Sequence, residues 1–203
     1  MILEYEGIKP DIHEDSYIAP NAVIRGDVSI GRGSCVLFGA AITAEGGPVT
    51  IGEECVIMEH AIVRGTPKDP AILGDAVLVG PQCHLSGYKI ESEVFIATGS
   101  TIFNGAHIKK HSEVRINGVV HVNTVLEEES MVPIGWIAVG NPAQIFPPGQ
   151  HNEIWQLQQQ MDFPGTVWGV ERSVSQGDRI RRYARALQRH RKDRRIAENS
   201  DPE

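Results

Sequence analysis

The residues of this sequence that could do chemistry are histidines close to a carboxylate. Glu59 and His60 are adjacent, and His84 follows further along the chain. Two imidazoles and a carboxylate could hold zinc or iron, and a bound metal would activate a water molecule. Glu59, His60 and His84 are therefore the candidate catalytic residues, and His60 with His84 is a candidate metal site.

Cysteine chemistry is not expected. Cys35, Cys55 and Cys83 are odd in number and form no C-x-x-C pair, which argues against a disulfide framework or a zinc knuckle and fits a reducing cytoplasm. No window holds the roughly 18 apolar residues of a membrane span, and residues 1–15 show no secretory leader. We expect a cytoplasmic protein without a membrane partner.

An aliphatic residue recurs at every sixth position. From Ile90 the series runs Ile90, Ile96, Ile102, Ile108, Val114, Val120, Leu126 and Val132. A small residue usually follows four positions later, as at Cys55 and Cys83, which we interpret as packing residues. An α-helix cannot produce a period of six, whereas a short strand followed by a tight turn can. The pattern predicts an all-β chain, a parallel β-helix with three hexapeptides per coil.

The register also predicts which side chains stack. The inward residues Val63, Leu85, Ile102 and Val120 fall on one face, and the residues after them form an outward column of Thr43, Arg64, Ser86, Phe103 and His121. Coils stack about 4.8 Å apart, so Arg64 and Ser86 should be neighbours. Longer connections at residues 43–50 and 64–72 should place loops on one face, which is often the binding face.

The chain divides into a β-helix domain at residues 1–145 and a C-terminal helical extension at residues 146–203 that packs on it. Helices are predicted at residues 150–161, with Ile154, Trp155 and Leu157 facing the body, and at residues 177–195, with Phe163-Pro164-Gly165 breaking the chain between them. Residues 1–171 carry 9 Lys and Arg against 21 Asp and Glu, and residues 172–203 carry 10 against 5. A basic tail on an acidic body favours docking on the protein itself over nucleic-acid binding.

Several stretches resemble the γ-class carbonic anhydrase-like family. They are KPDIHEDSYIAPNAVIRGDVSIG at 9–31, GRGSCVLFGAAI at 31–42, GPVTIG at 47–52, the segment at 77–108 and GNPA at 140–143. The resemblance covers roughly residues 8–145. It implies a left-handed β-helix, a homotrimer and a C-terminal helix along the coils.

The family resemblance also implies a metal held by three histidines, but the matching positions here hold Arg64, Pro81 and Ser86. Arg is a permanent cation with donors only, Pro has no side-chain donor atom, and a neutral Ser hydroxyl is a poor ligand. The family's Arg-Gly-Asp falls at Thr43-Ala44-Glu45. The resemblance therefore carries over the fold without the metal site, and no cofactor is expected. Zinc or iron at a relocated site of His60 and His84 is the alternative.

A fixed cation in place of a metal predicts a pocket for a small anion at Arg64 and Ser86. Alternatively, Arg64 pairs with Glu59 or Glu45 across a subunit contact in a site that has lost its function. Three classes stay open: a γ-carbonic anhydrase-like protein that is inactive or altered, a hexapeptide acyltransferase, and a non-catalytic trimeric scaffold or binding protein. Whether the chain is an enzyme is left open.

Overall fold

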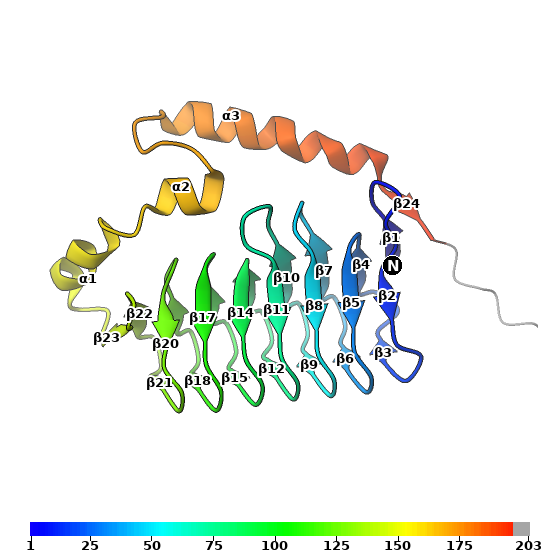
Figure 1. Ribbon diagram of the computed structural model, residues 1–203, viewed down its shortest axis with the longest axis horizontal. Coiled ribbons are helices and arrows are strands. Elements are labelled where there is room, and N and C mark those ends of the chain that lie inside the picture. Colours follow the sequence, from blue (N-terminus) through cyan, green and yellow to red (C-terminus); the bar gives the residue numbers. More distant parts are fainter. Residues whose placement is uncertain (197–203) are drawn as a thin grey trace, which may run out of the picture.

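A computed structural model describes residues 1–196, and its dominant feature is a parallel β-helix with three short strands per coil (Figure 1). Helices occur only after the last coil. The predicted all-β parallel β-helix with C-terminal helices is thereby confirmed, and the coils are consistent with left-handed winding. Residues 197–203, the end of the predicted extension, lie outside the described residues.

The strands form three sheets along the helix axis. In spatial order, the ten-stranded sheet contains β23 (Gln144–Phe146), β22 (Ile137–Val139), β19 (Val119–Val120), β16 (Thr101–Ile102), β13 (His84–Ser86), β10 (Ile62–Gly65), β7 (Ala41–Ala44), β4 (Val23–Arg25), β1 (Ile2–Glu4) and β24 (Arg194–Arg195). The second contains β2 (Asp11–Ile12), β5 (Val28–Ile30), β8 (Val49–Ile51), β11 (Ala71–Leu73), β14 (Tyr88–Ile90), β17 (Ala106–Ile108) and β20 (Val125–Leu126). The third contains β21 (Met131–Val132), β18 (Glu113–Val114), β15 (Phe95–Ile96), β12 (Leu78–Val79), β9 (Val56–Ile57), β6 (Cys35–Val36) and β3 (Tyr17–Ile18).

The core is the predicted aliphatic ladder. All eight members of the series from Ile90 to Val132 are buried, and none exposes more than 1% of its surface. Because one coil cannot bury its aliphatic face alone, this ladder stabilises the fold only when coils stack. Cys55 and Cys83 lie in the same core, as predicted, and the three cysteines are free. Burial raises the pKa of the Cys83 thiol to about 11, so it stays protonated and unreactive.

The long connections gather at one corner of the coils. Residues 45–48 join β7 to β8, and residues 66–70 join β10 to β11. Gly87 makes the short turn between β13 and β14 with φ +53°. Both longer loops project from the same side toward the last helix (Figure 1). The predicted clustering of loops on one face is confirmed.

The C-terminal extension departs from the predicted helices in detail. It contains α1 (His151–Gln158), α2 (Phe163–Trp168), α3 (Gln176–Leu187) and a 3₁₀ turn (Gln188–Lys192). Phe163-Pro164-Gly165, predicted as a break, begins α2, because Pro fits the first turn and the Asp162 carboxylate accepts a hydrogen bond from the Gly165 amide. In α1, Ile154 is buried and Trp155 is 51% exposed, so placing Trp155 toward the body was wrong. Adjacent helical residues point about 100° apart around the helix axis, so the contact between α1 and β22 buries Ile154 and leaves Trp155 exposed.

The predicted helix at 177–195 ends early for a structural reason. Ser175 caps the start of α3 by accepting a hydrogen bond from the Asp178 amide, 3.1 Å away. After the 3₁₀ turn, Asp193 is extended and Arg194 and Arg195 pair antiparallel with Glu4 and Leu3 of β1. Strand pairing with the first coil therefore replaces the last helical turns. No helix in the described part of the chain is both long and apolar enough to cross a membrane.

Candidate functional site

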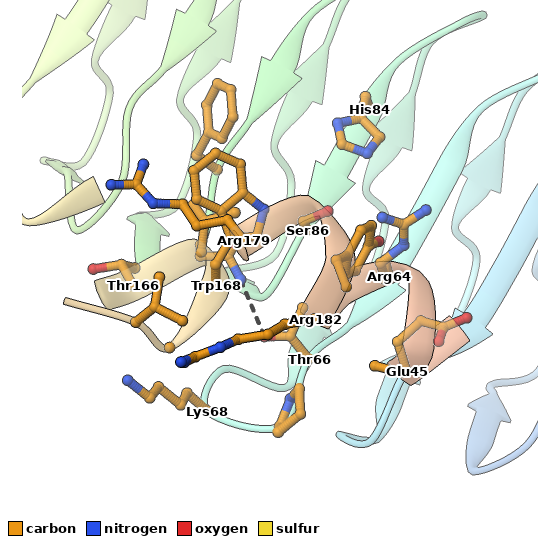
Figure 2. Close-up of a pocket in the computed structure, with 18 of the residues that line it drawn as sticks. Glu45, Arg64, Thr66, Lys68, His84, Ser86, Thr166, Trp168, Arg179 and Arg182 are labelled. Carbon is orange, nitrogen blue, oxygen red and sulfur yellow. Dashed lines mark hydrogen bonds between the residues drawn. The ribbon is translucent and has the colours of Figure 1, made fainter. Parts of the chain in front are cut away.

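A cavity of about 550 Å³ lies between the ten-stranded sheet on one side and α2 and α3 on the other (Figure 2). Its floor is formed by three residues of the outward column expected from the register, Arg64, Ser86 and Phe103. Arg64 pairs with Thr43 on one side and with Ser86 on the other. Phe103, which follows β16, continues the floor. The β-helix thus brings together Arg64 and Ser86, as predicted.

Arg64 is half-buried and lacks a partner for its charge. Its Nε is buried and makes no hydrogen bond, and within residues 1–196 no carboxylate forms an ion pair with its guanidinium. Ser86 beside it is only 6% exposed. A buried guanidinium nitrogen without an acceptor costs free energy unless a ligand or water supplies one. The floor therefore presents an unsatisfied cation next to a hydroxyl group.

Aromatic rings attach α2 to the β-helix. The Phe163 ring centroid lies 5.6 Å from that of Phe103, 5.7 Å from that of His121 and 5.6 Å from that of Trp168. Such tilted and edge-on contacts are favourable beyond the apolar area they bury. They hold Trp168 over the cavity as part of its wall.

Cations predominate around the cavity. Five basic side chains line it against one acidic side chain, which leaves four more positive than negative charges. The basic residues are Arg64, Lys68, Arg179, Arg182 and Arg189, and the acidic residue is Glu45. The whole chain has a formal net charge of −7, so this is a local reversal of sign. A concave site with one sign of charge attracts ligands of the opposite sign.

Among residues 1–196, Glu45 leaves the other four cations of the cavity unpaired, because it contacts Arg189 and two groups outside the cavity lining. Arg189 Nη2 donates to its Oε2 at 2.8 Å, Arg25 Nη1 lies 3.5 Å from its Oε1, and His190 Nε2 lies 3.3 Å from its Oε1. Arg25 is 2% exposed and donates two hydrogen bonds to Asp193, at 2.6 and 2.8 Å. These five residues, Arg25, Glu45, Arg189, His190 and Asp193, form what we call the C-terminal charge cluster.

The C-terminal charge cluster was not found in the sequence. Arg25 and Asp193 are 168 positions apart, and no sequence pattern pairs them. The only signal was the general one of a basic tail on an acidic body. In this cluster the basic tail supplies an acidic residue, because the Asp193 carboxylate accepts the hydrogen bonds of the buried Arg25. The cluster fixes the end of the extension on the first coils, and so holds α3 over the cavity.

His84 lines the cavity beside Arg64 and Ser86. Burial, and then the positive charge of Arg64, lower the pKa of the His84 imidazole. The ring is therefore neutral near pH 7 and could accept a proton or a hydrogen bond. The pKa of the Asp69 carboxyl is raised, because burial outweighs the opposing effect of a hydrogen bond from Asn104.

The other candidate residues lie elsewhere. His60 is exposed on the turn after β9 with φ +57°, and neither it nor Glu59 lines the cavity. Pro81 lines a second, largely apolar hollow of about 470 Å³ together with Met58, Phe95 and Ile116. Within residues 1–196, no three His, Cys, Asp or Glu side chains are grouped so that they could hold a metal ion.

Comparison with known proteins agrees with the repeat. The family profile described as bacterial transferase hexapeptide (six repeats) matches residues 9–44. The chain is 31% identical over 141 residues to gamma carbonic anhydrase 1, mitochondrial, from Arabidopsis thaliana, covering 66% of this chain and 49% of that protein. It is 33% identical over 108 residues to a carbonic anhydrase of Geobacillus kaustophilus, covering 53% and 59%. The chain is a γ-carbonic anhydrase-like hexapeptide-repeat protein.

The γ-carbonic anhydrase-like chain spans about half the length of the first curated relatives it matches. Among solved structures, a hexapeptide transferase family protein from Anaplasma phagocytophilum superposes with a TM-score of 0.53 at 23% identity, covering 79% of this chain and 92% of that one. That similarity supports the fold alone. Relatives with both anhydrase and transferase names share this architecture, so the activity has to be argued from the cavity.

Proposed function

We propose that this γ-carbonic anhydrase-like protein binds a small anion, such as a carboxylate, bicarbonate or phosphate, at Arg64 and Ser86 without a metal ion. The observation that carries the proposal is the Arg64 guanidinium, half-buried in a basic cavity without an acidic partner in the described part of the chain. Its planar fork matches carboxylate and phosphate oxygens, and the Ser86 hydroxyl adds a donor beside it. Bonds from an ionised group are roughly twice as strong as neutral ones.

The residues at these positions do not fit zinc or iron. Metal ligands must offer lone pairs, and Arg64 offers only donors on a permanent positive charge. A dication would also be repelled by the other cations that line the cavity. We therefore propose that the three-histidine metal site of the family is absent and that CO₂ hydration by a metal-bound hydroxide is lost or altered. Zinc or iron at a relocated site would need another ligand besides His60 and His84.

We also propose a homotrimer. Arg64 and Ser86 lie on one face of the coils, whereas Pro81 lies on another and lines the second hollow. The three positions that the resemblance groups into one site therefore meet only if two copies pack together. The apolar surface around Pro81, with Phe95 42% exposed and Ile116 45% exposed, suits burial in a subunit contact. Three free cysteines fit a reducing compartment such as the cytoplasm.

Calorimetric titration with acetate, bicarbonate and inorganic phosphate tests the anion site. Arg64→Met should weaken binding roughly tenfold or more, since it removes charge-assisted bonds and keeps most of the side-chain volume. The matched control is Arg32→Met, because Arg32 is an arginine that lines neither hollow, is 58% exposed and pairs with Glu53. Equal affinities in wild type and Arg64→Met would refute the proposal.

Elemental mass spectrometry of the untagged protein, with CO₂ hydration assays after zinc, cobalt or anaerobic iron loading, tests the absence of a metal. Substoichiometric metal and no hydration are expected. Near-stoichiometric metal would instead support a relocated site, to be examined first by substitution of His60 and His84.

A second candidate is a hexapeptide acyltransferase, and the neutral His84 in the cavity favours it. A general base must be unprotonated at the working pH, and the lowered pKa of His84 meets that condition. Coenzyme A should then raise the thermal unfolding midpoint, and His84→Gln should abolish acyl transfer without abolishing that shift. If neither anions nor coenzyme A bind, a trimeric scaffold is the remaining class.

A further inference from the structure

The cavity contains a second group of cations, separate from Arg64 in the sequence and on other elements. Lys68 belongs to the loop at residues 66–70, and Arg182 belongs to α3. Both are exposed, and in Figure 2 both side chains point to the same side of the cavity, away from Arg64. Arg179 lies three residues earlier in α3 and also lines the cavity.

None of these cations forms an ion pair with a carboxylate of residues 1–196. Lys68 Nζ donates to the Gly165 carbonyl at 3.0 Å, and Arg179 Nη2 donates to the Arg172 carbonyl at 2.8 Å. By contrast, Arg181, next to Arg182 on the outer side of α3, pairs with Asp178 at 2.9 Å. Like charges brought together without an acid repel each other unless an anion lies between them. The outer end of the cavity is therefore suited to a group with more than one negative charge.

Flat apolar surfaces line the same cavity. Phe103 rises from the floor, and Trp168 and Tyr183 come from the extension. The Arg179 guanidinium carbon lies 5.7 Å from the Trp168 ring centroid, which fixes both side chains at the wall. A cavity of about 550 Å³ is also much larger than bicarbonate or acetate requires.

From these contacts we propose that the cavity binds a phosphorylated organic acid with a flat apolar ring. Its phosphate binds Lys68 and Arg182, its ring lies against Trp168 and Phe103, and its carboxylate binds Arg64 and Ser86. The inference rests on the proposed function, because the carboxylate uses the same inner anion site. It adds an outer phosphate subsite, built by the loop and α3.

Calorimetric titration with inorganic phosphate, benzoate and 4-carboxyphenyl phosphate tests both parts separately. Wild type should bind 4-carboxyphenyl phosphate at least about tenfold more tightly than benzoate, because the added phosphate gains charge-assisted bonds. The double variant Lys68→Met/Arg182→Met should lose that gain and bind benzoate within about twofold of wild type. Arg181→Met is the matched control on α3 and should change neither affinity. Trp168→Leu should weaken both ring-bearing probes and spare inorganic phosphate.

The outcomes distinguish the two proposals. If benzoate depends on Arg64 but the double variant retains the full phosphate gain, the outer subsite is refuted and the inner anion site stands. If wild type binds none of the three probes, both are refuted. Since Lys68 and Arg182 are exposed, unchanged thermal unfolding midpoints should show that the double variant is folded.

Discussion

The β-helix and the C-terminal extension form opposite walls of one cavity by different means. In the β-helix, position follows from register, so each side chain sits above the corresponding residue of the previous coil. In the extension, α3 buries none of its side chains. α3 is held on either side, by aromatic contacts of α2 before it and by the C-terminal charge cluster after it.

This difference assigns different roles to the two walls. Stability concentrates in the densely packed coils, whereas elements with few buried contacts open locally at lower free energy. Arg64 and Ser86 therefore lie on a rigid surface, and Trp168 and Arg182 lie on an element that can move away from it. We infer that the inner anion site is preformed and that access to it depends on the extension.

The largest expected effect is in the core of the β-helix. Ile102 is fully buried in the ladder, so Ile102→Ala should lower the free energy of unfolding by about 2–5 kcal/mol, from lost apolar burial and the cavity left behind. Ile180→Ala is the control, because Ile180 is 60% exposed and lines neither hollow, and it should change stability by no more than about 0.5 kcal/mol. Urea unfolding measures both. Similar effects for the two variants would mean that the coils do not supply the stability.

The next effect concerns Gly87, a turn residue that packs against the loop at residues 66–70. Gly87 has φ +53°, and an added Cβ would lie 2.7 Å from the Asp69 Cβ and 2.8 Å from the Asn104 Nδ2. Gly87→Ala should therefore destabilise the protein by about 1–3 kcal/mol and displace the loop at residues 66–70. Gly135 has φ +69° but nothing within 4 Å of an added Cβ, so Gly135→Ala measures the backbone strain alone. Equal losses of unfolding free energy in the two variants would mean that steric contact with Asp69 and Asn104 contributes nothing.

A more local effect on stability is expected at the C-terminal charge cluster. Burial alone would raise the pKa of Asp193, but hydrogen bonds from Arg25 and His190 keep this pKa below its usual range. Asp193→Asn leaves the buried Arg25 charge without its acid and should destabilise docking of the extension by about 1–3 kcal/mol. Amide exchange in α3 should accelerate while exchange in the core strands does not. Glu171→Gln, at an exposed acid that precedes α3, is the control.

The same cluster should respond to acid. The folded pKa of Asp193 lies below its unfolded value near 3.8, so its contribution is complete well above that pH and disappears as the pH falls through the folded pKa. The protection factors of the α3 amides, which correct for the slower intrinsic exchange in acid, should thus fall on acidification in wild type and change less in Asp193→Asn. If α3 were equally protected in both proteins at every pH, the charge cluster would not be what holds it.

The sequence predicts the cavity wall made by the β-helix but not the wall made by the C-terminal extension. A period of six fixes which residues point inward, and the count of three per coil placed Arg64 next to Ser86 before any coordinates. No such periodicity governs the extension. Trp168, Arg182 and Asp193 reach the cavity or the first coils through contacts between distant segments, which single-residue preferences do not encode. The helix predicted through residue 195 failed for the same reason, because pairing with β1 overrode helix propensity.

The smallest expected effect is on the titration of His84, and it links the two walls. Burial is the larger cause of its lowered pKa, and Arg64 is the second. Arg64→Met should therefore raise the pKa of His84 while leaving it below the ordinary value of 6.5. Saturating phosphate should also raise the pKa in wild type, because a bound anion offsets the Arg64 charge. NMR titration of the imidazole Cε1–H resonance, assigned with His84→Gln, measures both shifts.

The sign of the accompanying stability change follows from linkage. The unfolded chain binds a proton at His84 at a higher pH than the folded chain does, so wild type should lose stability as the pH falls below about 6.5. Arg64→Met should lose less over the same range. A phosphate-induced rise in wild type that persists in Arg64→Met would place the anion at the outer cations and not at Arg64. If phosphate leaves His84 unaffected in both proteins, the anion does not bind on the floor of the cavity.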